Sequence, residues 1–202
     1  MNNPKFRASF SVLSQWADGN WERAVKSYFK LESFTTPAMA MGKEWHEKWA
    51  EHTRLTGCLP IEFGNTKLIK PIPEIKTVVS FGDWIDLVFI IDCLDEPTIH
   101  EYKTGKQSSE AYAGSMQLGV YGVGATMQGY YVNKGIIHHY DQYTKKSDNS
   151  IVWLTDKLLD DAQNWVLTIG GEMHDYFIKN DLYARFGKLT ELPMPDLSTK
   201  PL

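Results

Sequence analysis

The stretch DWIDLVFII, residues 83–91, constrains the fold most, because an extended strand with this pattern is apolar on both of its faces. A strand buried on both sides has to be covered by further layers of the protein. The chain has 202 residues, of which 43% are hydrophobic, so it is long enough and apolar enough to build a substantial core. We therefore expect an α/β (α+β) protein in which helices flank one mixed β-sheet.

Helical and extended patterns alternate along the chain. Helices are expected over 9–30 as two short pieces, over 37–55, over 108–128 and over 155–179. Strands are expected over 66–70, 74–82, 83–91 and 98–103, and a strand or a hairpin over 129–143. The boundary of the second helix is the best marked, since Thr36-Pro37 is an N-cap followed by proline in the first turn, and Gly57 follows the end. We expect a single domain over 1–186 and a loose tail over 187–202.

Composition limits the classes of protein to consider. The chain has no run of 18 apolar residues and no apolar signal core at its N-terminus, which predicts a soluble, cytoplasmic protein without a membrane partner. Its only cysteines, Cys58 and Cys93, cannot make a four-cysteine metal or iron–sulfur site. The net charge of −4 counts mildly against a nucleic-acid partner, although a local basic patch would be enough to bind one.

The most chemically suggestive segment is IHEYKTGK, residues 99–106. Side chains alternate along a strand, so Glu101 and Lys103 are expected on one face. If the preceding hairpin turns near residues 93–96, Asp86 lies opposite positions 101–103, about 5 Å away. Two carboxylates that converge in an apolar setting favour a divalent cation between them. The alternative is that Asp86 and Glu101 simply form ion pairs with Lys103 or another base.

Two further places carry polar residues that could join Glu101. Gln117 and Tyr121 are four residues apart and share one stripe of the helix over 108–128; the alternative is a solvated helix face. His46 lies on the helix over 37–55, where a lone histidine is more often structural or exposed than a ligand. None of the other histidines is assigned any chemistry.

Four segments in order resemble the PD-(D/E)XK nuclease superfamily, and most closely its RecB-type and Cas4-type exonuclease branch. These segments are MGKEWHEKW, GDWIDLV, IHEYKTGK and MQLGVYG, preceded by SFSVLSQW, which is similar to the first helix of that branch. The resemblance spans roughly residues 9–180. It implies a restriction-endonuclease-like core, which is a mixed β-sheet flanked by helices, within a single nuclease-like domain over 1–186.

The resemblance also implies roles for individual residues. His46, Asp86, Glu101 and the backbone carbonyl of Tyr102 would be ligands of Mg²⁺ or Mn²⁺. Lys103 would be the catalytic lysine. Gln117 and Tyr121 would support the site and hold the substrate.

The chain departs from the family pattern in two ways. Gly82 precedes Asp86 by four residues rather than three, so Asp83 is an alternative ligand; Asp86 is preferred on its match to IDLV and on the expected hairpin register. The four cysteines of the iron–sulfur members are missing.

The function implied is a metal-dependent DNA exonuclease acting in DNA recombination, repair or processing. The alternatives on the same fold are a structure-specific endonuclease, an RNase and a non-catalytic DNA-binding module. The number of subunits stays open, a homo-oligomer included.

Overall fold

The computed structural model describes residues 5–32 and 35–186, so the tail expected over 187–202 lies outside the described residues. The elements, in chain order, are β1 (Phe6–Ser9), α1 (Phe10–Ala17), α2 (Trp21–Tyr28), α3 (Pro37–Thr56), the 3-10 helix η1 (Ile61–Phe63), β2 (Ile72–Phe81), β3 (Ile85–Asp95), β4 (Thr98–Thr104), α4 (Ser109–Ala113), α5 (Gln117–Met127), β5 (Lys134–Asp141), β6 (Lys146–Trp153), α6 (Asp156–Lys179) and α7 (Leu182–Phe186). No helix in this described part of the chain is both long and apolar enough to cross a membrane.

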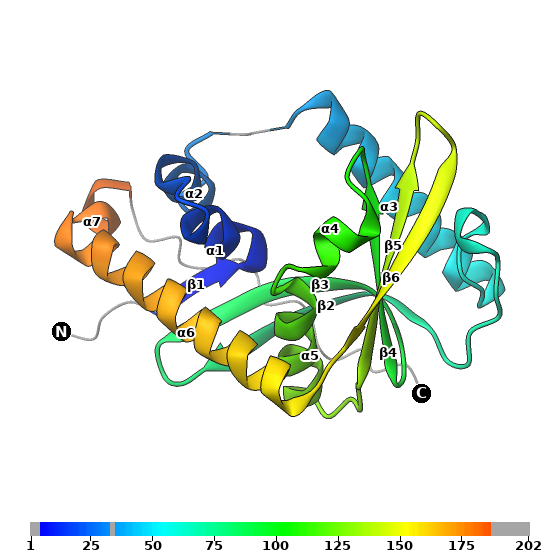
Figure 1. Cartoon of the computed structure of the whole chain (residues 1–202). Coiled ribbons are helices and arrows are strands. Elements are labelled where there is room, and N and C mark those ends of the chain that lie inside the picture. The colour runs from blue at the N-terminus through cyan, green and yellow to red at the C-terminus, as the bar shows by residue number, and fades with distance from the viewer. Residues whose placement is uncertain (1–4, 33–34, 187–202) are drawn as a thin grey trace. The chain divides into compact units, whose positions relative to one another are not determined.

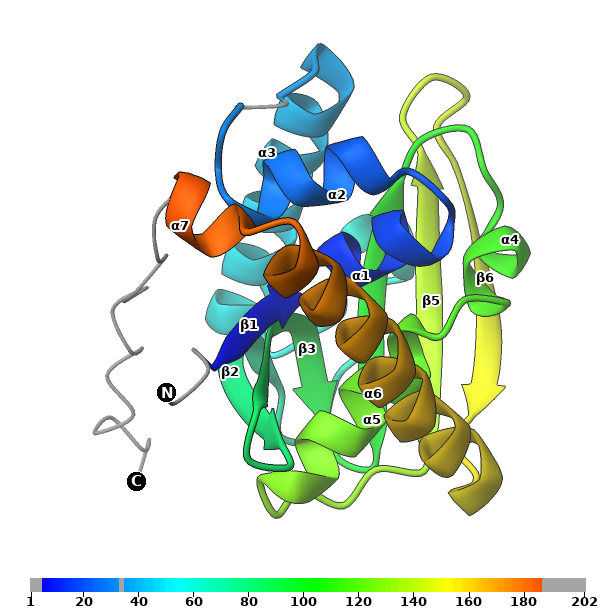
Figure 2. The same cartoon turned by 90° about the vertical axis from the view of Figure 1, so that its left-hand side faces the viewer.

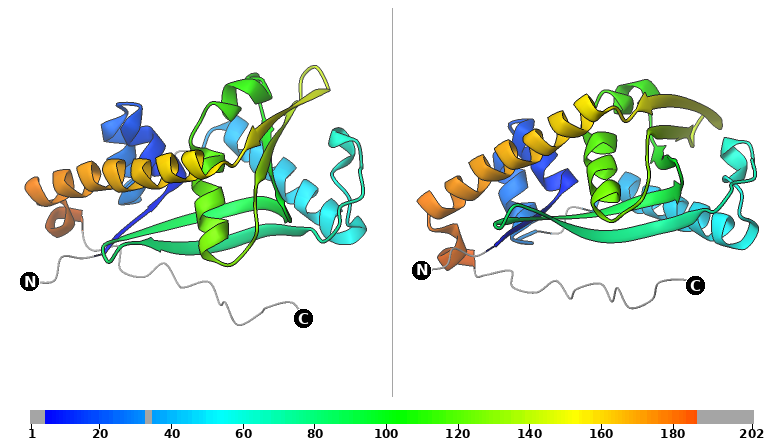
Figure 3. Two further views of the ribbon diagram at one scale, coloured as in Figure 1. Left: turned by 60° about the horizontal axis from the view of Figure 1, so that its bottom comes forward. Right: turned by 90° about the horizontal axis from the view of Figure 1, so that it is seen from below.

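Six strands pair into one mixed sheet in the order β1-β3-β4-β5-β6, with β2 paired to β3 beside this path. The β1–β3 and β4–β5 pairs are parallel, whereas β3–β4 and β5–β6 are antiparallel. Figure 3 shows β2 and β3 running side by side as a long ribbon. The α/β class expected from the sequence, with a mixed sheet flanked by helices, is confirmed.

The chain divides into two compact units, which are described here one at a time. The described residues of the first unit are 5–32, 76–89 and 165–186. Its core is aromatic, since Phe6 stacks on Tyr28 at 5.1 Å and Phe177 packs against both rings. Figure 2 shows the elements that carry these three residues, β1, α2 and α6. Gly170 lets α6 approach Ile85 of β3, because a Cβ at that position would lie 2.4 Å from the isoleucine Cδ1. The expectation of a single domain over 1–186 stays a prediction.

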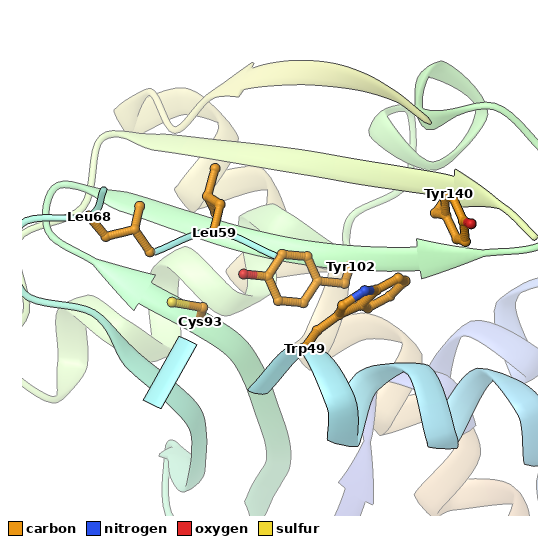
Figure 4. Close-up of a cluster of buried hydrophobic side chains, with 6 residues drawn as sticks. All are labelled: Trp49, Leu59, Leu68, Cys93, Tyr102 and Tyr140. Carbon is orange, nitrogen blue, oxygen red and sulfur yellow. The ribbon is translucent and has the colours of Figure 1, made fainter. Parts of the chain in front are cut away.

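The second unit comprises residues 35–75 and 90–164. Helix α3 begins at Pro37 behind the Thr36 cap and ends at Gly57, as expected; Gly57 adopts the left-handed conformation of a helix end. Its Trp49 packs 5.5 Å from the ring of Tyr102 on β4, in a buried cluster that also holds Cys93 (Figure 4). This packing anchors α3 against one face of the strands that carry the candidate site.

Two glycines of α5 allow a close helix–helix contact within the second unit. A Cβ at Gly119 would lie 3.0 Å from the Cβ of Ala162, and one at Gly122 would lie 2.8 Å from the Cδ2 of Leu159. Helix α5 is therefore buried along nearly its whole length against the start of α6. Neither glycine was singled out in the sequence, and a Cβ at Gly114, just before this helix, would meet nothing within 4 Å.

Four sequence expectations differ from the structure. Residues 66–70 are not a strand but form one isolated bridge between Lys67 and Cys58. The helix expected over 108–128 is divided into α4 and α5. Strands β1 and β6 were not predicted as such, because β1 has four residues and β6, KSDNSIVW, is a polar and mostly exposed edge strand. The strand expected over 83–91 begins later, at Ile85, and continues to Asp95.

Candidate active site

The candidate site forms where the paired part of the β3–β4 hairpin ends. The paired residues run from Asp95 with Thr98 to Cys93 with His100. Just beyond, the backbone N–H of Tyr102 donates 2.8 Å to the Oδ2 of Asp92. The residue beside Glu101 is therefore Asp92. The expected register, with Asp86 opposite positions 101–103, is wrong because β3 runs four residues past Ile91 before the chain turns at Glu96-Pro97.

Glu101 is the centre of this cluster. Its Oε1 accepts hydrogen bonds from Lys103 Nζ and from Gln117 Nε2, both at 2.7 Å. Its Oε2 is buried and has no hydrogen-bond partner among the described residues. Burial and the neighbouring Asp92 raise the pKa of Glu101, which Lys103 offsets only in part. The site therefore holds a buried carboxylate with one oxygen ready to accept a cation or a donor.

Lys103 lies at the end of the same strand face, and its side chain is 20% exposed. Burial lowers and the Glu101 carboxylate raises the pKa of Lys103, and the net shift is upward. The Nζ atom also lies 5.6 Å from the centre of the Tyr112 ring. In this environment Lys103 is an ammonium ion, suited to stabilising negative charge next to Glu101.

Helix α5 contributes Gln117 and Tyr121, which lie one turn apart. The Gln117 Nε2 that donates to Glu101 also donates to the Tyr121 hydroxyl at 2.9 Å. Burial and the Glu101 charge raise the pKa of Tyr121, so its hydroxyl stays protonated. The structure thus brings Glu101, Lys103, Gln117 and Tyr121 together, as the sequence motifs anticipated.

On α3, His46 lies against Asp92. Its Nδ1 donates to the Asp92 Oδ1 at 3.0 Å, so each oxygen of this carboxylate accepts one hydrogen bond. Burial lowers and Asp92 raises the pKa of His46, with a net upward shift. Asp92 was missed in the sequence because the strand was expected to end at Ile91; an acid inside the apolar run FIIDCL was the signal available.

Asp86 is grouped with different residues. It accepts hydrogen bonds from Ser80 at 2.7 Å and Arg7 at 3.2 Å, and it forms an ion pair with Lys5 at 2.7 Å. Its pKa is lowered, because these three donors outweigh the effect of burial. Asp83 is exposed in the turn between β2 and β3. Of the two aspartates weighed as ligands, Asp86 belongs to this separate ion-pair cluster of the first unit, and Asp83 faces solvent.

The loop after β4 is anchored by a group that the sequence did not single out. His139 on β5 places its Nε2 2.9 Å from the Gly105 carbonyl and its Nδ1 2.6 Å from the Asp148 Oδ1. The other oxygen of Asp148 accepts the backbone N–H of Ser109 at 2.8 Å. Parallel pairing of β5 with β4 sets His139 beside Lys103, and no sequence pattern revealed this position.

The donor set suits a hard divalent cation. Among the described residues, no three His, Cys, Asp or Glu side chains form a ready-made metal cage. However, the Oε2 of Glu101 has no hydrogen-bond partner in the described part of the chain, and Glu101 is close enough to a second carboxylate, Asp92, for the two charges to interact. A backbone carbonyl such as that of Tyr102 is a common further ligand. Mg²⁺ is usually held by one or two carboxylates with waters, so this sparse set fits it.

Comparisons with known proteins give a fold but no family. No family model and no curated protein matches the chain. Among solved structures, the crystal structure of SSO0001 matches with a TM-score of 0.50 at 12% identity, over 83% of this chain and 79% of that one. An alkaline exonuclease, LHK-Exo from Laribacter hongkongensis, matches at 0.46 with 12% identity, over 90% and 93%. LHK-Exo in complex with dAMP matches at 0.47 with 10% identity, over 88% and 93%. At these identities we take only a shared fold, and only from the first.

Proposed function

We propose that this protein is a metal-dependent nuclease that hydrolyses the phosphodiester bonds of DNA, and that it acts as an exonuclease. The observation that carries this proposal is Glu101. One of its oxygens is fixed by Lys103 and Gln117, while the other is buried without a partner among the described residues. A buried carboxylate with an unpartnered oxygen lowers the stability of the fold. A cation bound to that oxygen, beside the amine of Lys103, would compensate the charge and give the arrangement a role in catalysis.

The cation we propose is Mg²⁺ or Mn²⁺, held by Glu101, Asp92 and the carbonyl of Tyr102. Asp92 takes the role first expected of Asp86. His46 donates from Nδ1 to Asp92, which leaves Nε2 as the nitrogen that could bind the ion. When bound, such an ion polarises a phosphodiester oxygen and lowers the pKa of a coordinated water.

The side chains of this chain supply the remaining functions. Lys103, a cation in this environment, stabilises the negative charge that develops on the phosphate and orients the attacking water. Gln117 holds the Glu101 carboxylate in place and is itself held next to Tyr121. The His139 anchor fixes the loop that directly follows Lys103.

The test is a cleavage assay on end-labelled single-stranded and duplex DNA, with Mg²⁺, with Mn²⁺ and with EDTA. Cleavage should require the metal, and Lys103→Ala should slow it by roughly a hundredfold to a thousandfold, as expected for losing a group that stabilises the transition state. Lys157→Ala is the matched control, because Lys157 is also an ion-paired lysine; its partner is Asp161, one turn further along α6.

Covalently closed circular DNA separates the finer alternatives, since an exonuclease needs an end and an endonuclease does not. An RNA substrate included in parallel tests for an RNase. Metal-independent cleavage, or a Lys103→Ala protein with wild-type activity, would refute the proposed active site.

A further inference from the structure

The carboxyl ends of two parallel strands meet at one edge of the second unit. Thr104 at the end of β4 pairs with Tyr140 near the end of β5, so the loops that follow these strands start side by side (Figure 1). The segments KTGKQS, residues 103–108, and QYTKKS, residues 142–147, together hold four lysines and no acidic residue. In a chain of net charge −4, this edge is locally basic.

Three lysines of this edge are not held in ion pairs with other described residues. Lys106, Lys145 and Lys146 are exposed, and within the described part of the chain none of them forms an ion pair. The two acids nearest to Lys145 and Lys146 in sequence accept hydrogen bonds from other groups, although both add negative charge to this edge. Asp141 accepts from the backbone N–H of Tyr143 and from the Thr144 hydroxyl, both at 2.8 Å. Asp148 is occupied by the His139 anchor described above. The lysines are therefore available to an anionic ligand.

An aromatic ring stands among these lysines. Tyr143, in the turn between β5 and β6, is 66% exposed. The Nζ of Lys106 lies 6.0 Å from the centre of its ring, and the Nζ of Lys145 lies 6.0 Å from that of the neighbouring Tyr140. We call Lys106, Tyr143, Lys145 and Lys146 the lysine–tyrosine strip.

The strip is physically joined to the candidate active site. Lys106 follows Lys103 by three residues, in the loop that leaves β4, and the Nε2 of His139 lies 2.9 Å from the carbonyl oxygen of the intervening Gly105. The Tyr112 ring packs near both Lys103 and His139. A chain of nucleotides bound along the strip would therefore lead to the end of β4 that carries Lys103.

We propose that the lysine–tyrosine strip binds single-stranded nucleic acid, with the lysines contacting phosphates and Tyr143 stacking on an unpaired base. This rests on the proposed nuclease function and specifies its substrate as an unpaired strand. Single strands are favoured over a duplex because an exposed ring can stack only on a base that is free of its partner. The contacts of the lysines with phosphates should show no sequence preference, because every nucleotide carries a phosphate.

Binding is measured by fluorescence anisotropy of a fluorescein-labelled oligothymidylate of about 20 nucleotides, in EDTA so that no cleavage occurs. Tyr143→Ser should weaken binding roughly tenfold, as for the loss of one stacked base. The double variant Lys145→Ala/Lys146→Ala should reduce the slope of log affinity against log salt by about 1.4, as for two lost phosphate contacts. Thermal unfolding of each variant verifies that these exposed changes leave the fold intact.

The matched control is Lys70→Ala/Lys157→Ala, which changes the net charge by the same amount with two other exposed lysines of the second unit. Its binding should stay within about twofold of wild type, since surface charge away from the strip acts only at long range. Three results would overturn the strip: equal weakening by the control, unchanged binding in both strip variants, or preferred binding of a duplex of the same length.

The binding experiment and the DNA cleavage assay test the two proposals independently. If the wild-type protein binds the oligonucleotide through the strip but cleaves no DNA, the strip proposal stands and the nuclease proposal is refuted. If the wild-type protein cleaves DNA and the strip variants bind the oligonucleotide normally, the nuclease proposal stands and the strip proposal is refuted.

Discussion

Asp86 and Glu101 are two buried carboxylates, 4% and 3% exposed, with opposite surroundings. Asp86 faces two cations and a hydroxyl, and its pKa is lowered. Glu101 faces one cation and one amide beside a second acid, and its pKa is raised. The charge of Asp86 is compensated by its neighbours, whereas the charge of Glu101 is compensated only in part. Burial of a carboxylate in a strand therefore does not by itself indicate an active site, whereas incomplete neutralisation makes Glu101 the candidate of the two.

The largest expected contrast between the two regions is in catalysis. Asp92→Asn removes the charge beside Glu101 and should lower the cleavage rate roughly a hundredfold or more. Asp86→Asn should stay within a few-fold of wild type at a temperature where both are folded. Rates are compared at saturating Mn²⁺, and metal affinity is measured by calorimetry. If Asp86→Asn loses metal binding while Asp92→Asn keeps it, the assignment of the two aspartates is reversed.

The second contrast is in stability. Replacing each carboxylate with the corresponding neutral amide should change the stability of the protein in opposite directions at the two positions. Asp86→Asn should lower the free energy of unfolding by about 2 kcal/mol, below the usual cost of breaking a buried pair because Lys5 is 45% exposed. Glu101→Gln should not destabilise the metal-free protein and should raise its melting temperature, since it removes a buried charge with an unpartnered oxygen. Thermal unfolding in EDTA measures both. Equal losses in the two variants would mean that Glu101 is an ordinary structural ion pair.

A third, smaller effect concerns metal preference. Imidazole suits Mn²⁺ better than Mg²⁺, so wild type should need less Mn²⁺ than Mg²⁺ for cleavage. His46→Ala should narrow this gap and weaken Mn²⁺ binding roughly tenfold, whether His46 binds the ion or orients Asp92. Parallel titrations of both ions with both proteins decide the matter. Superimposable curves would remove His46 from the site.

The smallest expected effect is the pH dependence of the stability that Asp86 contributes. Its folded pKa lies below the ordinary aspartate value of 3.8, so its contribution to stability is present above that pH and is lost as the pH falls through the folded pKa. The stability difference between wild type and Asp86→Asn should therefore be constant above about pH 5 and shrink in more acidic solution. Urea unfolding at several pH values measures this. A difference that persists unchanged at pH 2 would contradict the ion-pair account.

Local rules in the sequence were enough for several parts of the site. Alternation along a strand placed Glu101 and Lys103 together, and a spacing of four placed Gln117 and Tyr121 together. The cap at Thr36-Pro37 located the helix that carries His46. These predictions succeeded because each depends on residues close in sequence within one regular element.

The rest depended on contacts that sequence patterns do not encode. The choice of Asp92 over Asp86 required the hairpin register, which a shift of a few residues in the turn changes completely. The His139 anchor required the parallel pairing of β5 with β4. Strand β6 was missed because one exposed, polar edge strand looks like a loop in sequence.

The glycines of α5 have a consequence for how firmly the site is held. Glycine costs a helix about 1 kcal/mol relative to alanine, and α5 has three among its 11 residues, so it would not be a stable helix alone in water. Its order comes instead from close packing on Leu158, Leu159 and Ala162 at the start of α6. Local unfolding of that segment would release Gln117 from Glu101 without any change in β4. Backbone amides of α5 and of the start of α6 should therefore exchange hydrogen together, as one cooperative unit.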